Sequence, residues 1–227
     1  MTIYISLIRD HLQPGFNSAK SPLAYQDRHG LTIVWVVSGI VEVDRKTVEA
    51  SQSRVLDPKH NVKSLTSAVD QIRFTLSNRA LTPSVENGGS EEASHSELLM
   101  SKPVQIEPVS QLFRLDQVDF PPGAVAYKHT HPGPGIRFLV DGELTLRSEH
   151  GTTVYGAGDA WFEDANQPVM AKSTGQDTGF FVRAMLLPIE FAGKPTFTLC
   201  DKNDADKPKR QTNTRHMEFE INLETLV

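Results

Sequence analysis

Two histidines in the second half of the chain, His129 and His131, are the residues best suited to chemistry. They lie in the segment AYKHTH, and residues two apart in a strand point to the same face of its sheet. Two neutral imidazoles side by side suit Zn, Ni, Fe or Cu. A catalytic zinc site usually takes three protein ligands and a structural one four, so further groups are needed nearby.

Three more polar residues could share this interior. By strand alternation Tyr127 lies on the face of His129, Arg137 points inward from the next strand, and Glu163 ends the segment GDAWFED. Glu163 has two alternative roles, third metal ligand or ion-pair partner of Arg137, because a buried guanidinium needs a carboxylate. We therefore expect a polar pocket with metal ligands His129, His131 and Glu163, and with Tyr127 and Arg137 as ligand-binding residues.

Glycine spacing places these residues in a known pattern. The chain runs Gly123, five residues, His129-Thr-His131, three residues, Gly135, six residues and Gly142. This resembles the first motif of the cupin superfamily, G-x5-HxH-x3-E-x6-G, with Gly135 at the glutamate position. The resemblance implies a small β-barrel of the jelly-roll type.

The second cupin motif, G-x5-PxG-x2-H-x3-N, is matched less fully. Gly158 opens it, five residues precede Asp164, and Asn166, Val169 and Ser173 follow in its spacing. In the family the glutamate of the first motif and the histidine of the second complete the metal shell. Here that histidine position holds Val169, so the resemblance implies an open metal site with two family ligands.

The pattern occurs twice in the chain, which resembles the two-barrel members of the family, the bicupins. IVWVVSGIVEV from Ile33 and IRFLVDGELTL from Ile136 superpose without a gap, placing Gly39 on Gly142. Upstream, AYQDRH echoes AYKHTH, and downstream DPKHNV falls on DANQPV. The order of strand, glycine turn, strand and proline-bearing turn is the same in both copies.

The first copy lacks the polar residues of the second. Val34 stands at the position of Arg137, and Leu56 at the position of Glu163. We therefore expect an N-terminal barrel filled with apolar side chains and structural in role, and a ligand site in the C-terminal barrel alone.

Short apolar runs between turn residues predict an all-β fold of two tandem jelly-roll barrels. The expected parts are an N-terminal barrel over residues 1–83, a polar linker over 84–106, a C-terminal barrel over 107–200, and a polar tail over 201–227 with a terminal strand. The alternative is one large domain in which the polar stretches are surface loops. The clearest predicted strands are Leu31–Val43, Ile72–Leu76, Leu112–Phe120, Ile136–Arg147 and Gly179–Leu187.

Composition excludes several classes of protein. The chain has 227 residues, a net charge of -5 and no apolar run of membrane-spanning length, so we expect neither a nucleic-acid nor a membrane partner. The N-terminus lacks the features of a secretory signal. A single cysteine, Cys200, cannot form an internal disulfide, which fits a cytoplasmic protein. Hydrolase, NTPase and dinucleotide-binding motifs are absent from the sequence.

Two functions remain open on this evidence. The first is a mononuclear metal enzyme with a divalent transition metal (Zn, Ni, Fe or Cu) that acts on a small organic acid, whose carboxylate Arg137 would hold. The second is a non-catalytic barrel that binds or senses a small anion without metal. The expected partner is in either case a small-molecule carboxylate, and a homodimer is left open.

Overall fold

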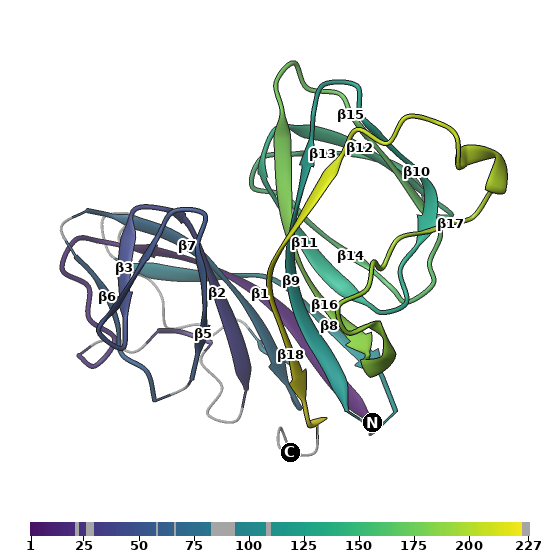
Figure 1. The fold of residues 1–227 in the computed structure, drawn as a ribbon. Coiled ribbons are helices and arrows are strands. Elements are labelled where there is room, and N and C mark those ends of the chain that lie inside the picture. The colour runs from purple at the N-terminus through teal and green to yellow at the C-terminus, as the bar shows by residue number, and fades with distance from the viewer. Residues whose placement is uncertain are drawn as a thin grey trace. The chain divides into compact units, whose positions relative to one another are not determined.

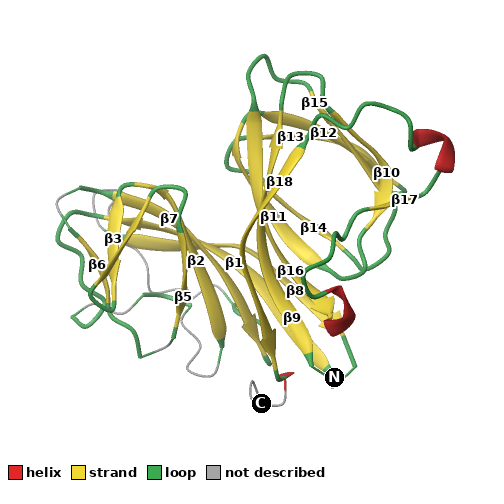
Figure 2. Ribbon diagram, viewed as in Figure 1, coloured by secondary structure: helices red, strands yellow, loops and turns green. Residues whose placement is uncertain are grey.

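The computed structural model describes residues 1–20, 23–25, 30–57, 59–65, 67–82, 94–107 and 110–223. It is built almost wholly of strands and divides into two compact units (Figures 1 and 2). Unit 1 is Met1–Val109 with Asn222–Val227, and unit 2 is Ser110–Ile221. The prediction of an all-β chain with two barrel-like halves is confirmed. No helix among the described residues is long and apolar enough to cross a membrane.

Unit 1 contains two antiparallel sheets. Five strands pair in the order β5-β2-β7-β1-β8, and three shorter ones in the order β4-β3-β6. The bounds are β1 Thr2–Leu12, β2 Leu31–Ser38, β3 Ile40–Val43, β4 Lys46–Glu49, β5 Ser53–Leu56, β6 Val62–Ser64, β7 Val69–Ser77 and β8 His95–Gln105.

Unit 2 contains two five-stranded sheets, in the orders β14-β11-β16-β9-β18 and β13-β12-β15-β10-β17, which curve around a common interior (Figure 1). Two three-residue 3-10 helices, η1 Ile189–Phe191 and η2 Lys202–Asp204, flank β17. The strands are β9 Gln111–Phe120, β10 Val125–Thr130, β11 Gly135–Asp141, β12 Glu143–Ser148, β13 Gly151–Gly156, β14 Ala160–Glu163, β15 Val169–Ser173, β16 Gly179–Pro188, β17 Thr198–Leu199 and β18 Thr212–Ile221.

The strand registers reproduce the internal repeat. Thr32 pairs with Leu56 as Gly135 pairs with Glu163, which supports the alignment of the two copies. Both copies then turn at a glycine with positive φ, 85° at Gly39 and 89° at Gly142. An added Cβ would lie 2.4 Å from the Ala68 carbonyl oxygen in the first case and 2.6 Å from the Gly179 Cα in the second. A side chain is therefore excluded at both turns by conformation and by space.

Residues 26–29 of AYQDRH, and Pro58 of DPKHNV, lie outside the described residues.

Residues 84–93 of the linker expected over 84–106 lie outside the described residues. His95–Gln105 forms β8, which pairs with β1 along its length and so belongs to unit 1. The sequence HSELLMSKPVQ is polar because β8 is an edge strand with few buried residues. A polar edge strand and a linker have similar compositions, since solvent covers both. The tail expected over 201–227 likewise contributes an edge strand, β18, to unit 2.

Unit 1 has an apolar core at the positions predicted to be apolar. Val34 and Leu56 are almost fully buried in one cluster of aliphatic side chains from β1 to β7. The same unit also buries an ion pair that the sequence interpretation missed. Arg73 on β7 donates from Nε and Nη2 to the two carboxylate oxygens of Asp10, at 2.7 and 2.8 Å. The described part of unit 1 therefore combines an apolar cluster with a closed, buried ion pair.

Candidate functional site

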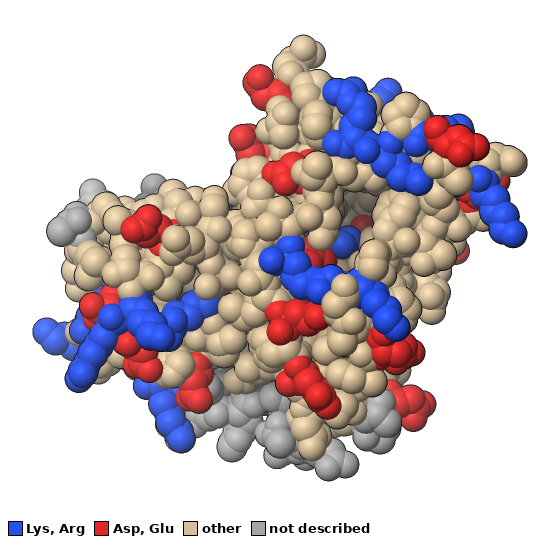
Figure 3. All heavy atoms as spheres, in the orientation of Figure 1, with Lys and Arg blue, Asp and Glu red and all other residues tan. Residues whose placement is uncertain are grey.

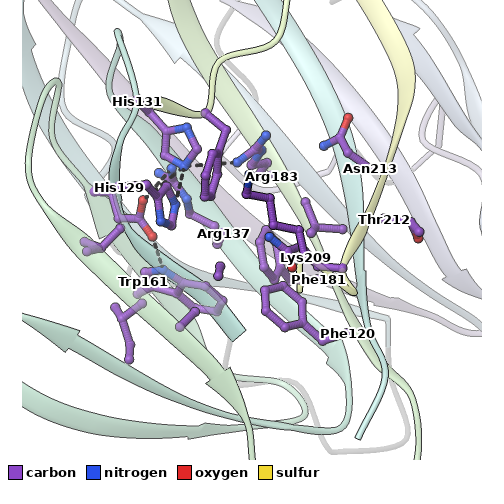
Figure 4. Close-up of a pocket in the computed structure, with 18 residues that line it drawn as sticks. Phe120, His129, His131, Arg137, Trp161, Phe181, Arg183, Lys209, Thr212 and Asn213 are labelled. Carbon is purple, nitrogen blue, oxygen red and sulfur yellow. Dashed lines mark hydrogen bonds and ion pairs between the residues drawn. The ribbon is translucent and has the colours of Figure 1, made fainter. Parts of the chain in front are cut away.

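A cavity of about 240 Å³ lies inside unit 2, enclosed by strands of both of its sheets. Its polar end is formed by His129, His131, Arg137 and Arg183, which Figure 4 labels, and by Glu163, which is ion-paired with Arg137. In the space-filling view of Figure 3, unit 2 shows a hollow with charged atoms at its bottom. The structure thus brings four of the five predicted site residues together and adds one that was not predicted.

Tyr127, predicted to bind a ligand, does not line this cavity. The pairing of β10 with β15 changes register between Ala126 and His129, because one extra residue is inserted in β10 as a β-bulge. The simple alternation that placed Tyr127 beside His129 therefore fails, and Ala126 lines the cavity instead. The Tyr127 ring lies 5.0 Å from the Lys207 Nζ and lines a separate groove of unit 2.

Backbone carbonyls fix the orientation of both histidine rings. His129 Nδ1 lies 2.7 Å from the Tyr127 carbonyl oxygen, and His131 Nδ1 lies 2.9 Å from that of Thr196. Because a carbonyl oxygen only accepts, each Nδ1 carries the proton. Burial lowers the pKa of His129 to about 4. Burial, followed by the charges of Arg183 and Arg137, lowers the pKa of His131 well below its usual value.

At neutral pH both rings are therefore uncharged, and each Nε2 presents a lone pair. The two Nε2 atoms lie 3.2 Å apart. Arg183 Nη1 donates to His131 Nε2 at 3.2 Å. Among the residues that the structure describes, His129 Nε2 meets no donor. Besides Glu163 Oε2, which is ion-paired with Arg137, the polar end of the cavity thus contains a buried acceptor, His129 Nε2, that a bound molecule could satisfy.

Arg137 and Glu163 form the ion pair that was one of the two predicted alternatives. Their Nη2 and Oε2 atoms lie 2.7 Å apart, although the angle is too bent for a hydrogen bond. Arg137 Nη1 donates to the Gly135 carbonyl, and Trp161 Nε1 donates to Glu163 Oε1 at 2.8 Å. Burial lowers the pKa of Arg137 to about 10, with Glu163 opposing that shift. The guanidinium is therefore charged at neutral pH, and its charge is balanced within the protein.

Arg183, on β16, is the residue that the sequence interpretation missed. It donates from Nε and Nη2 to a single oxygen of Asp116, at 3.4 and 3.2 Å, and from Nη2 to Thr196 Oγ1 at 3.4 Å. These bonds are long for a charge-assisted pair. The signal in the sequence is an arginine within an otherwise apolar run, FFVRAMLL, since a charged residue in a buried strand needs a partner or a function.

These residues provide only part of a metal site. Two Nε2 atoms 3.2 Å apart could bind one transition metal at ordinary Zn–N distances of about 2.0–2.1 Å. Glu163 Oε2 is 3.8 Å from His131 Nε2 and is paired with Arg137. No group of three or more His, Cys, Asp or Glu in the described part of the chain has the arrangement of a metal site. Because two guanidinium groups also face this point, the residues present do not fit a complete metal shell, and Glu163 as third ligand stays a prediction.

The rest of the cavity is apolar, apart from its mouth. Three exposed residues border the cavity away from the histidines: Lys209, which precedes β18, and Thr212 and Asn213 at the start of that strand (Figure 4). Phe197 stacks on His129 with ring centroids 4.1 Å apart and closes one side. Between the two ends lie aromatic and aliphatic side chains, among them Val118, Phe120, Leu146, Trp161, Val169 and Phe181.

Comparison with known proteins adds a family and a fold. Residues 117–182 match the family of the Cupin domain. None of the curated proteins matches the sequence significantly.

Among solved structures, an oxalate decarboxylase from Lactobacillus farciminis, in a formate complex, is 14% identical with a TM-score of 0.58. The match covers 89% of this chain and 82% of that one. A putative glyoxylate-induced protein from Pseudomonas aeruginosa is 16% identical with a TM-score of 0.56, covering 81% and 74%. AerE from Microcystis aeruginosa is 16% identical with a TM-score of 0.55, covering 82% and 88%. At these identities the likeness concerns the fold.

Proposed function

We propose, from the premise that residues 117–182 form a cupin domain in a chain of two cupin-fold barrels, that unit 2 binds a small organic acid inside its barrel. Arg183 is the residue that holds the carboxylate. One observation carries the proposal: a guanidinium lines the cavity while it is bonded only loosely, and to one oxygen, by its own carboxylate. A ligand carboxylate could accept from it in the two-pronged geometry that arginine favours.

Arg137, the expected carboxylate-binding residue, is less suited to that role. Its Nη2 is 2.7 Å from Glu163 and its Nη1 donates to a backbone carbonyl. A carboxylate bound there would compete with a buried ion pair, and would leave Glu163 uncompensated at a high cost in free energy. The role proposed for Arg137 is to hold Glu163, and through it the Trp161 indole.

Titration calorimetry with a panel of acids, formate, oxalate, lactate and 3-phenyllactate, tests the proposal. At least one acid should bind to the wild type. Arg183→Lys should weaken that binding about tenfold or more, because lysine keeps the positive charge but cannot donate two parallel hydrogen bonds to a carboxylate. Arg147→Met, which removes an exposed arginine from the same unit, is the matched control and should bind as the wild type does. Binding of no acid, or equal binding by Arg183→Lys, would contradict the proposal.

A metal-dependent enzyme acting on a small organic acid is the second candidate. It is supported by the two Nε2 lone pairs, which converge while each Nδ1 is bonded to a carbonyl as in many metal-binding histidines. The check is titration of protein made without a His-tag with Zn²⁺, Ni²⁺, Fe²⁺ and Cu²⁺. His131→Ala and Glu163→Gln should both lose affinity, and His150→Ala, an exposed histidine, should not. Equal binding by all the variants would rule out this site as the metal site.

A further inference from the structure

We infer that the ligand of unit 2 is an apolar-bodied hydroxy acid, a small aromatic or branched aliphatic group that carries a carboxylate and an adjacent hydroxyl. This inference rests on the proposed function and narrows it from small organic acids in general. It follows from the different chemistry of the polar end of the cavity and of its walls.

The polar end requires both an acceptor and a donor from the ligand. Arg183 lines the cavity and makes only long bonds to Asp116, so its guanidinium can donate to a carboxylate. His129 Nε2, with its proton on Nδ1, offers a lone pair and therefore takes an O–H donor. His131 lies between them, with its Nε2 3.2 Å from the Nε2 of His129 and from the Nη1 of Arg183. A carboxylate and a hydroxyl on adjacent carbons supply this acceptor and this donor side by side.

The walls require an apolar body. Phe120, Phe181, Trp161 and Leu146 line the space between the histidines and the mouth, and all four are buried. A simple diacid such as oxalate would leave these apolar walls in contact only with water. A hydrocarbon group would instead bury apolar surface, at about 0.8 kcal/mol for each methylene equivalent.

The volume of the cavity limits the size of that body. A protein cavity of roughly 150 Å³ holds benzene. The cavity of unit 2 measures about 240 Å³, so one six-membered ring with a side chain of a few heavy atoms fits. A fused polycyclic body does not. The polar residues Lys209 and Thr212 at the mouth allow the far end of the ring to reach water.

The test is a series of matched acids on wild-type protein, followed by calorimetry and by fluorescence of Trp161, which lines the cavity. The series is 3-phenyllactate, 3-phenylpropanoate, which lacks the hydroxyl, lactate, which lacks the ring, and oxalate. We expect 3-phenyllactate to bind most tightly. Loss of the ring should weaken binding about 10- to 100-fold, and loss of the hydroxyl about tenfold.

One variant locates the apolar body. Ala171→Leu adds bulk to the cavity wall. It should weaken the binding of 3-phenyllactate at least tenfold, while lactate should bind as tightly as it does to the wild type. Lactate is the internal control for the head-group site, and the wild-type series decides the inference even where this variant does not fold.

The outcomes separate this inference from the proposed function. If lactate or oxalate binds as tightly as 3-phenyllactate, the inference of an apolar body is wrong, but the proposed binding of an organic acid is supported. If 3-phenylpropanoate binds equally well, the hydroxyl is wrong. If no acid binds, the proposed function fails and this inference fails with it.

Discussion

The two units place an arginine at the same position of the same fold and use it differently. Arg73 pairs with Val34 across β2 and β7 as Arg183 pairs with Arg137 across β11 and β16. Arg73 is bonded to both oxygens of Asp10 at 2.7 and 2.8 Å, and also to the Ala24 carbonyl. Arg183 reaches one oxygen of its carboxylate, at 3.2 and 3.4 Å.

The partner carboxylates explain this difference. Asp10 lies opposite Gln71 in the strand register, two residues from Arg73, and from there both of its oxygens meet the Nε and Nη2 edge of the guanidinium. Asp116 is directly opposite Arg183, and from there only one of its oxygens is reached. A closed pair stabilises a core, whereas a pair with long bonds can give up donors to a ligand. Duplicated barrels can therefore diverge in function through the placement of one carboxylate, with the arginine unchanged.

The largest effect on stability is expected when unit 1 receives an arginine at Val34, the position that Arg137 occupies in unit 2. Val34→Arg would bury a guanidinium beside Arg73 with Leu56 in place of a carboxylate, and should lower the free energy of unfolding by about 4 kcal/mol. Urea denaturation followed by tryptophan fluorescence measures it, since Trp35 and Trp161 lie one in each unit. Adding Leu56→Glu should recover part of the loss, and an additive further loss would show that the equivalence is wrong.

Acid should destabilise unit 2 more than unit 1. The pKa of His129 is about 4 in the folded state, below the usual 6.5, so between these values the unfolded chain binds a proton that the folded chain does not. The free energy of unfolding should therefore fall by about 3 kcal/mol as the pH drops from 6.5 to 4. His131 acts in the same direction.

The same denaturation experiment at several pH values checks this prediction. His129→Gln, which does not titrate, should reduce the slope of unit 2 alone. The described histidines of unit 1 are all partly exposed, so its slope should stay smaller. Parallel slopes in both units would contradict the assignment.

The two aspartates should differ in their effect on stability. Asp10→Asn breaks a two-oxygen buried pair, and should cost about 2 kcal/mol more than Asp116→Asn, whose bonds are longer and share one oxygen. Thermal denaturation of the two variants side by side provides the measurement. Equal losses would show that the open geometry of Arg183 is no weaker than the closed geometry of Arg73.

The smallest effect on stability is expected when the ion pair of unit 2 is replaced by the apolar residues found at the same positions in unit 1, Val34 and Leu56. Arg137→Val with Glu163→Leu removes both charges together, so no buried charge is left unpaired, and stability should change by about 1 kcal/mol or less. Arg137→Val alone leaves Glu163 buried without its cation and should cost clearly more. A double variant no more stable than the single one would contradict this reading of the pair.

Much of the architecture could be predicted from the sequence. Alternation of apolar residues indicated strands, and the spacing of Gly39 and Gly142 indicated two copies of one unit, because each turn needs a residue without a Cβ. The family resemblance stated on the glycine and histidine spacing is confirmed by the match over residues 117–182. Strands and glycine turns depend on the types of residues close together in the sequence, so they can be predicted from the sequence itself.

Other features depended on contacts between distant parts of the chain. Tyr127 does not line the cavity because a bulge shifts the pairing of β10 with β15 by one residue. A prediction from simple alternation takes no account of such an inserted residue. Residues 95–105 became a strand because β1 offered an edge to pair with. The sequence by itself determined the fold class, the repeat and the histidine pair. Only the tertiary structure decided that Arg183, 52 residues beyond His131, reaches its Nε2, since side-chain geometry across strands is set by packing rather than by spacing along the chain.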